Sequence, residues 1–267
     1  MKKLNKKKLI FGTLIFTVLA AMYIPILVIF IFSFTAGAVI NFSDFEFTFQ
    51  LYRDLINNDR IMEAVFNTLL IAAIAAFLAT IIGTMACVGM MKMRRRSKGL
   101  MMGLNLTPMI NATIVTGFSL VLLFVLLGIV NQGYIRLILA HTLVALPIVM
   151  LIVLPRMKSL DPNVFEAAQD LGATPSQAFF QVMVPLLMPA MIGAFLVGFT
   201  ISVDEFIITN YNNAGVTTIP TLVYQGRRPM AAEFRALSSI VFFTVIMALI
   251  IVNIVISRKQ KKSKRRI

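Results

Sequence analysis

The chain has 267 residues, of which 59% are hydrophobic and only 13% are charged. Its mean hydropathy of +0.89 is far too high for a soluble domain, so we expect an integral membrane protein surrounded by lipid. The formal net charge is +14, and Cys87 is the only cysteine. One cysteine excludes an internal disulfide and a cysteine-based metal site, and we expect no metal and no cofactor.

The basic residues lie beside apolar segments. Four groups hold 19 of the 25 lysines and arginines, at residues 2–8, 92–98, 156–158 and 258–266. By the positive-inside rule, these groups predict that the neighbouring ends of the spans, and both termini of the chain, face the cytoplasm. The charge therefore indicates membrane topology, and we expect no nucleic-acid partner.

Six apolar segments predict an all-α, multi-pass protein of the cell membrane, with one transmembrane domain over residues 1–267. The expected spans are residues 9–34, 62–91, 99–127, 134–155, 186–209 and 234–257. A helix needs about 20 residues to cross a bilayer. The first segment follows a basic start, but its roughly 25 apolar residues exceed the 7 to 15 or so of a cleavable signal peptide.

The second span carries Gly83 among several alanines, which predicts a face for close helix packing. Polar residues and a proline interrupt the start of the third span, at Asn105, Thr107, Pro108 and Asn111. They predict either a broken backbone that lines a pore or a simple kink. His141, the only histidine, lies about one turn into the fourth span. Two roles are expected for it: a structural hydrogen bond to a neighbouring helix, or proton coupling.

A polar segment between the fourth and fifth spans, residues 161–189, predicts two short helices joined by a turn. Asp161 and Pro162 are typical of a helix start, and Gly172 is typical of a helix end. Thr174 and Pro175 repeat the start pattern. The second helix is expected to run from Pro175 to Val184 and to stop at Pro185, because proline cannot continue the intrahelical hydrogen-bond ladder.

Residues 159–189 contain acids but no lysine or arginine, so a DNA-reading helix-turn-helix is excluded. A plain amphipathic connection and a docking element remain. The pattern Glu166-Ala167-Ala168, then Gly172, then Val184-Pro185 resembles the EAA loop of the membrane subunits of bacterial ABC importers. That resemblance implies a cytoplasmic coupling loop, at about residues 156–186, that inserts into a groove of an ATP-binding subunit. It assigns ATPase coupling to Glu166, Ala167, Ala168, Gly172 and Pro185.

The order of the spans, the loop position and the segment FTISVDEFI resemble the permease subunits of spermidine/putrescine importers, which have the type I ABC importer transmembrane fold. The resemblance implies a second, non-identical permease, a dimer of ATP-binding subunits and an external substrate-binding protein. The chain has no phosphate-binding G-x-x-x-x-G-K-[ST] motif, so we expect a transport subunit and not an enzyme. The alternatives are a permease for another small solute and a secondary transporter. An intramembrane enzyme is not supported, because the sequence contains no catalytic nucleophile and base motif in a span.

Asp204 and Glu205 follow a long uncharged run at the end of the fifth span. Carboxylates there are costly unless they face water, protein or a cation. Three interpretations are open. The two acids mark the outer interface, or one of them pairs with a base such as Arg136. In the third interpretation they line the substrate pathway, where one of them holds an ammonium group of a polyamine. Adjacent helical residues point about 100° apart, so only one of the two acids is expected to face the pathway squarely. We expect that acid to be Asp204. Tyr211 and Tyr224 are candidates for cation–π contacts near the entrance.

Overall fold

The computed structural model describes residues 6–35, 46–91, 93–161, 163–225, 232–244 and 246–247. These residues are predominantly helical, which confirms the all-α prediction. The only strand-like pairing among them is an isolated bridge between Thr35 and Phe47. The chain divides into two compact units, residues 1–62 with 225–267, and residues 63–224.

The first unit begins with α1 (Lys6–Phe32), the predicted first span, with Pro25 inside the helix. Its side chains from Phe11 to Leu27 are almost all exposed, as suits a helix that faces lipid. The short helix α2 (Gln50–Asn57) was not predicted. It buries Leu51 and Leu55 on one face.

Aromatic side chains hold the segment before α2 against the end of α1. The ring of Phe34 contacts the rings of Phe47, Phe49 and Tyr52 at centroid distances of 5.3 to 5.7 Å. The hydroxyl groups of Ser33 and Tyr52 are 2.8 Å apart. Residues 233–244 of the first unit are helical, as predicted for the start of the last span. The remainder of that span, from residue 248 on, lies outside the described residues.

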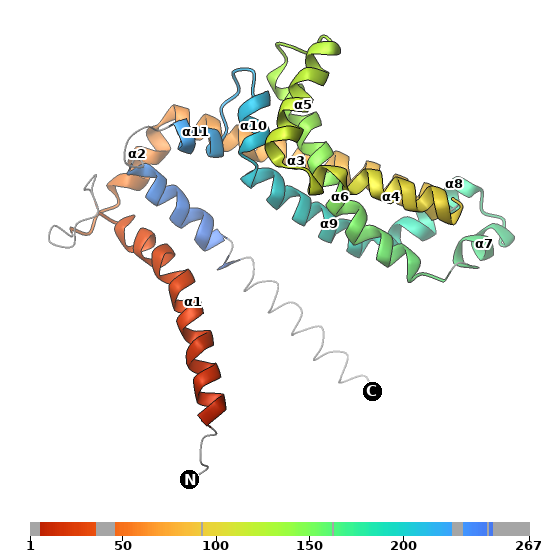
Figure 1. The fold of residues 1–267 in the computed structure, drawn as a ribbon, viewed down its shortest axis with the longest axis horizontal. Helices are drawn as coiled ribbons and strands as arrows, with labels where there is room; N and C mark the ends of the chain where they lie inside the picture. Colours follow the sequence, from red (N-terminus) through yellow and green to blue (C-terminus); the bar gives the residue numbers. More distant parts are fainter. Residues whose placement is uncertain are drawn as a thin grey trace. The chain divides into compact units, whose positions relative to one another are not determined.

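The second unit contains most of the spans (Figure 1). Its elements are α3 (Asp59–Met91, which starts in the first unit), α4 (Arg95–Ile110), α5 (Thr113–Leu126), α6 (Gly133–Lys158), α7 (Asn163–Asp170), α8 (Pro175–Gln177), the π-helix η1 (Ala178–Met183), α9 (Val184–Asp204), α10 (Ile207–Asn212) and α11 (Ile219–Gln225).

The helices α3, α6 and α9 pack through small side chains, as the pattern in the second span predicts. A Cβ atom at Gly83 of α3 would lie 2.7 Å from the Val149 side chain of α6. One at Gly198 of α9 would lie 3.6 Å from Ala145 and 3.8 Å from Ala76. Small residues thus let the helix backbones approach closely, which favours van der Waals packing where lipid removes the hydrophobic driving force.

Four helices in the described residues are long and apolar enough to cross a membrane: 11–32, α3, α6 and the continuous helix of residues 175–204. The pair α4 and α5 makes a fifth if it is one broken span. The chain is therefore a multi-pass membrane protein. The predicted count of six is not reached because the last span lies partly outside the described residues.

The prediction that the second loop helix stops at Pro185 is wrong. The helix continues from α8 through η1 into α9. The N–H of Val184 bonds to the carbonyl of Phe179, five residues back. Proline lacks an N–H and its ring clashes with the carbonyl four residues earlier. We infer that the wider π turn relieves this clash, so Pro185 lies near the start of α9 without ending the helix.

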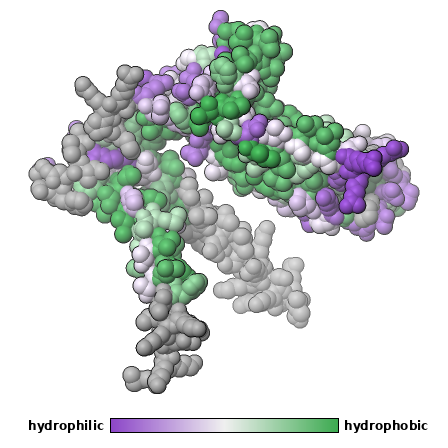
Figure 2. Space-filling view, viewed as in Figure 1, coloured by the Kyte–Doolittle hydropathy of each residue, from purple (hydrophilic) through white to green (hydrophobic). Residues whose placement is uncertain are grey.

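Apolar side chains cover most of the visible helical surface of the second unit (Figure 2). Hydrophilic surface is concentrated at the end where α7, α8 and the start of α4 lie (Figures 1 and 2). The break after α9 lies at the other end of the same unit (Figure 1). The predicted coupling loop and the predicted pathway residues are thus separated by the length of α9.

Candidate functional site

The polar loop after α6 starts as the sequence predicts. The Asp161 carboxylate accepts a hydrogen bond of 2.9 Å from the backbone N–H of Asn163, at the start of α7. Pro162 lies outside the described residues. Glu166 and Ala167 are exposed on α7, and Ala168 is half-buried. The loop therefore presents the acid and one of the two small residues at the protein surface.

Gly172 ends α7 in the left-handed conformation, with φ +90°. Two backbone hydrogen bonds close the turn: Gly172 N–H to the Gln169 carbonyl at 2.8 Å, and Ala173 N–H to the Ala168 carbonyl at 3.1 Å. This pair of bonds is a Schellman motif, which satisfies two carbonyl groups at the helix end. A non-glycine residue rarely adopts this backbone conformation, which explains the glycine.

The second half of the loop also begins as predicted. The Thr174 hydroxyl accepts from the N–H of Gln177, and the Gln177 side chain accepts from the N–H of Thr174 at 2.9 Å. This reciprocal capping box fixes the start of α8. Two large apolar side chains that sequence reasoning missed stand out here, because Leu171 is 91% exposed and Phe180 is 67% exposed. An apolar residue inside a polar turn, such as Leu171, is the signal that could have found them.

The second predicted site lies where α9 ends. The predicted continuous helix to Thr209 is wrong: α9 stops at Asp204, Glu205 is extended with ψ 105°, and α10 begins at Ile207. Asp204 is exposed, whereas Glu205 is half-buried. The adjacent acids therefore have different surroundings.

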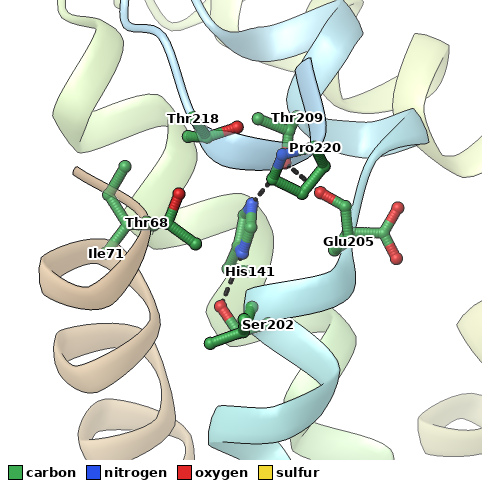
Figure 3. Close-up of a pocket in the computed structure, with 9 residues that line it drawn as sticks. Thr68, Ile71, His141, Ser202, Glu205, Thr209, Thr218 and Pro220 are labelled. Atoms are coloured by element: carbon green, nitrogen blue, oxygen red, sulfur yellow. Dashed lines mark hydrogen bonds between the residues drawn. The ribbon is translucent and has the colours of Figure 1, made fainter. Parts of the chain in front are cut away.

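The Glu205 carboxylate acts as a cap for α10. It accepts a hydrogen bond of 3.1 Å from the backbone N–H of Ile208. The carboxylate points away from His141 and toward the start of α10 (Figure 3). A negative group at a helix N-terminus satisfies a free N–H and matches the helix dipole. Glu205 thus has a structural role that sequence reasoning did not assign to it.

The predicted alternative that an acid pairs with Arg136 finds no support in the described residues. The Arg136 guanidinium donates to the Val130 carbonyl at 2.8 Å and lies 5.7 Å from the centre of the Phe124 ring. Arg136 is only 7% exposed. It therefore fastens the turn between α5 and α6, and no ion pair to Asp204 occurs in the part of the chain that the structure describes.

The two predicted tyrosines lie apart from each other. Tyr224 on α11 contacts the ring of Phe206 at 4.5 Å, directly after the acidic pair. Tyr211 on α10 is 42% exposed and lies over Gly117 of α5, where an added Cβ atom would be 3.3 Å from its ring. The structure thus brings Tyr224 to the break in the fifth span, and it places Tyr211 against α5.

The predicted break in the third span is present. The helices α4 and α5 are bent by 106° relative to each other, with Asn111 and Ala112 between them. A bend of this size is a broken span or a re-entrant segment and not a simple kink. Asn212 of α10 donates to the Gly117 carbonyl of α5 at 3.1 Å, which ties the two broken segments together.

His141 lies in a narrow pocket beside the break in the fifth span (Figure 3). Its Nδ1 is 2.6 Å from the Ser202 hydroxyl of α9, and its Nε2 is 2.9 Å from the Thr209 hydroxyl of α10. The structural hydrogen bond predicted from the sequence is therefore confirmed, with two partners.

The fold and these features define a multi-pass helical membrane protein with broken spans. Residues 79–267 match the family described as binding-protein-dependent transport system inner membrane component. The chain belongs to this family. It is therefore a transport subunit and not an enzyme.

Individual relatives are also transport permeases. The chain is 32% identical over 252 residues to the putrescine transport system permease protein PotI of Escherichia coli K12, with 91% of this chain and 89% of PotI covered. It is 30% identical over 258 residues to the spermidine/putrescine transport system permease protein PotC of the same strain, with 96% of each covered. A bacterial ABC transporter that imports the polysaccharide alginate shares the fold, with a TM-score of 0.66, 15% identity, and 93% and 94% of the two chains covered.

Proposed function

We propose that this chain forms part of the membrane pathway of an ATP-driven importer for polyamines such as spermidine and putrescine. The single observation that carries the substrate class is the exposed Asp204 carboxylate at the C-terminal end of α9. The C-terminal end of a helix carries partial negative charge, so the helix and the carboxylate both favour a cation at this point. The names of the relatives PotI and PotC support the same class.

Polyamines suit this position because they are flexible, multiply charged ammonium compounds. Asp204 attracts one ammonium group, and the Phe206 and Tyr224 rings beside the break supply aromatic faces for a second contact. Binding at such a point is weak, because a conducting site must release what it admits. The bend between α4 and α5 is a second candidate lining, since irregular backbone at membrane depth requires protein or water around it.

Energy reaches the pathway through the loop of residues 156–186. In this proposal the exposed Glu166 and Ala167 of α7, together with Leu171, dock into an ATP-binding subunit, and Ala168, Gly172 and Pro185 shape the loop. Support comes from the 91% exposure of Leu171, a large apolar side chain in a polar turn. Because the loop helix continues through η1 into α9, a movement of the loop is transmitted along α9 toward Asp204.

The assembly contains a second, non-identical permease, a dimer of ATP-binding subunits and an external substrate-binding protein. The loop and both termini face the cytoplasm. The basic start of α4 supports this orientation, since it lies at the same end of the second unit as α7 (Figure 1).

The test is uptake by the complete complex in proteoliposomes, with the binding protein outside and ATP inside. We expect ATP-dependent uptake of radiolabelled putrescine or spermidine, and competition by the unlabelled diamine. Vesicles loaded with a non-hydrolysable ATP analogue are the control. Transport of an anion or a neutral sugar in place of the polyamine would overturn the proposed substrate class.

A further inference from the structure

One side chain of α6 forms hydrogen bonds on both sides of the break in the fifth span. His141 is 3% exposed and contacts Ser202, which lies before the break, and Thr209, which lies after it. Ser202 is 4% exposed and Thr209 is fully buried. The His141 imidazole therefore depends on these two hydroxyl groups for its hydrogen bonds, because water does not reach it freely.

The direction of each hydrogen bond follows from the partners. The Thr209 hydroxyl donates to the Glu205 carbonyl, so its oxygen accepts from His141 Nε2–H. A neutral imidazole carries one N–H, so Nδ1 is the acceptor and receives a hydrogen bond from the Ser202 hydroxyl. The result is a one-directional chain from Ser202 through His141 and Thr209 to the Glu205 carbonyl. Dashed lines in Figure 3 mark the hydrogen bonds of this chain.

Local sequence does not enforce the break. Residues 203–207 contain neither glycine nor proline, and a continuous helix is the default for this stretch. In a continuous helix, Ser202 and Thr209 would be about 10.5 Å apart along the axis, at 1.5 Å per residue. An imidazole with one hydrogen bond on each side is too short to join them. The His141 bridge can therefore form only when the helix is broken.

We propose that His141 is a positioning residue, which holds the fifth span in its broken form and thereby fixes the end of α9 that carries Asp204. This inference rests on the proposed function only for its effect on transport. The bridge selects one backbone form over the other, because the straight form separates the buried imidazole from at least one of its two hydroxyl partners. The substrate-facing acid then sits at a helix end and not on the side of a longer helix.

The test compares two substitutions at Thr209. Thr209→Val keeps the shape and removes the hydroxyl, whereas Thr209→Ser keeps the hydroxyl and removes a methyl group. Ser202→Ala is a second variant that cuts the other side of the bridge. Thr142→Val is the control, since Thr142 is the neighbour of His141 but bonds to the Ile138 carbonyl at 2.7 Å. The readouts are amide hydrogen exchange at residues 207–212 in the detergent-solubilised complex and the KM and maximal rate of putrescine uptake.

Ser202→Ala should speed exchange at residues 207–212 by about three- to tenfold, the effect of one lost hydrogen bond. Thr209→Val should speed it at least as much, because the Thr209 hydroxyl bonds to both His141 and the Glu205 carbonyl. Both variants should raise KM by a similar factor with less effect on the maximal rate. Thr209→Ser and Thr142→Val should resemble the unmodified protein in both measurements.

Equal effects of Thr209→Ser and Thr209→Val would show that packing and not the bridge matters, and would overturn the proposal. Unchanged exchange in Thr209→Val would overturn it too, as would faster exchange with an unchanged KM if Asp204→Asn does lower uptake. The exchange measurement involves no substrate. It therefore tests the bridge even if Asp204→Asn leaves uptake unchanged and the proposed pathway role of Asp204 fails.

Discussion

The Glu205 carboxylate accepts the backbone N–H of Ile208 at 3.1 Å, while the preceding residue, Asp204, is exposed at the end of α9. Two neighbouring acids thus serve different purposes. Glu205 caps α10 and belongs to the scaffold, whereas Asp204 is available to a cation. A double substitution alone therefore mixes two effects, and the single variants separate them.

Glu205→Gln should leave the fold and uptake close to normal, because a glutamine oxygen still accepts the Ile208 N–H. Glu205→Ala should destabilise the complex by about 0.5–2 kcal/mol, the usual effect of losing a helix cap. The chain has no tryptophan, so thermal unfolding of the purified complex is followed by aggregation or by thiol labelling. The measurement gives the difference in stability between the two variants. Equal stability of the two variants would contradict the capping role.

Gly172→Val should lower transport without lowering the amount of protein in the membrane. An added Cβ at Gly172 meets no atom within 4 Å, so the effect comes only from φ +90°, which costs an ordinary residue about 1–2 kcal/mol. Gly172→Asn is the matched control, because asparagine adopts this conformation more readily. Substrate-stimulated ATP turnover measures coupling. Full turnover in Gly172→Val would show that the turn geometry does not govern docking.

Gly83→Ala should destabilise the packing of α3 on α6, and Gly89→Ala on the same helix should not. The new methyl group at residue 83 would lie 2.7 Å from the Val149 side chain, whereas at residue 89 it meets nothing within 4 Å. Overpacking of this kind costs about 1–3 kcal/mol. The two variants can be compared by the midpoint of thermal unfolding in detergent. A lower midpoint for Gly89→Ala than for Gly83→Ala would contradict the packing described for this pair.

Orientation can be tested with single cysteines in a Cys87→Ala background. Asn57, Ser97 and Ser176 are all exposed in the structure, so differences in their labelling report the side of the membrane. A membrane-impermeant thiol reagent should label Asn57→Cys in intact cells, and Ser97→Cys and Ser176→Cys only after lysis. Labelling of position 176 from outside would reverse the proposed topology.

The coupling loop was largely predictable from sequence because its signals are local. Asp161 caps α7, Gly172 takes the left-handed turn, and Thr174 forms a capping box with Gln177. The predicted helix end at Pro185 was wrong, because a π turn accommodates a proline that would clash in an ordinary α-helix.

The break after Asp204 was not predictable from local sequence. The Glu205 carboxylate caps Ile208 locally, three residues along the chain. The His141 bridge depends on tertiary structure, since His141 and Thr209 are 68 residues apart in the chain. The bend between α4 and α5 was predictable, because Pro108 and Asn111 are local breakers. Local chemistry therefore predicted the turns of the loop and indicated a break or a kink in the third span, and a long-range hydrogen-bond bridge accounts for the break in the fifth span.

The most direct test of the central claim is the rate of putrescine uptake by the Asp204→Asn complex in proteoliposomes, with Asp204→Glu as the matched control. Removal of the charge should reduce uptake about tenfold or more, since a charge-assisted hydrogen bond to an ammonium group contributes about 1.5–3 kcal/mol. Complex assembly and basal ATP hydrolysis should be retained, and Asp204→Glu should recover part of the uptake. Unchanged polyamine uptake in Asp204→Asn would contradict a role for this acid in the pathway.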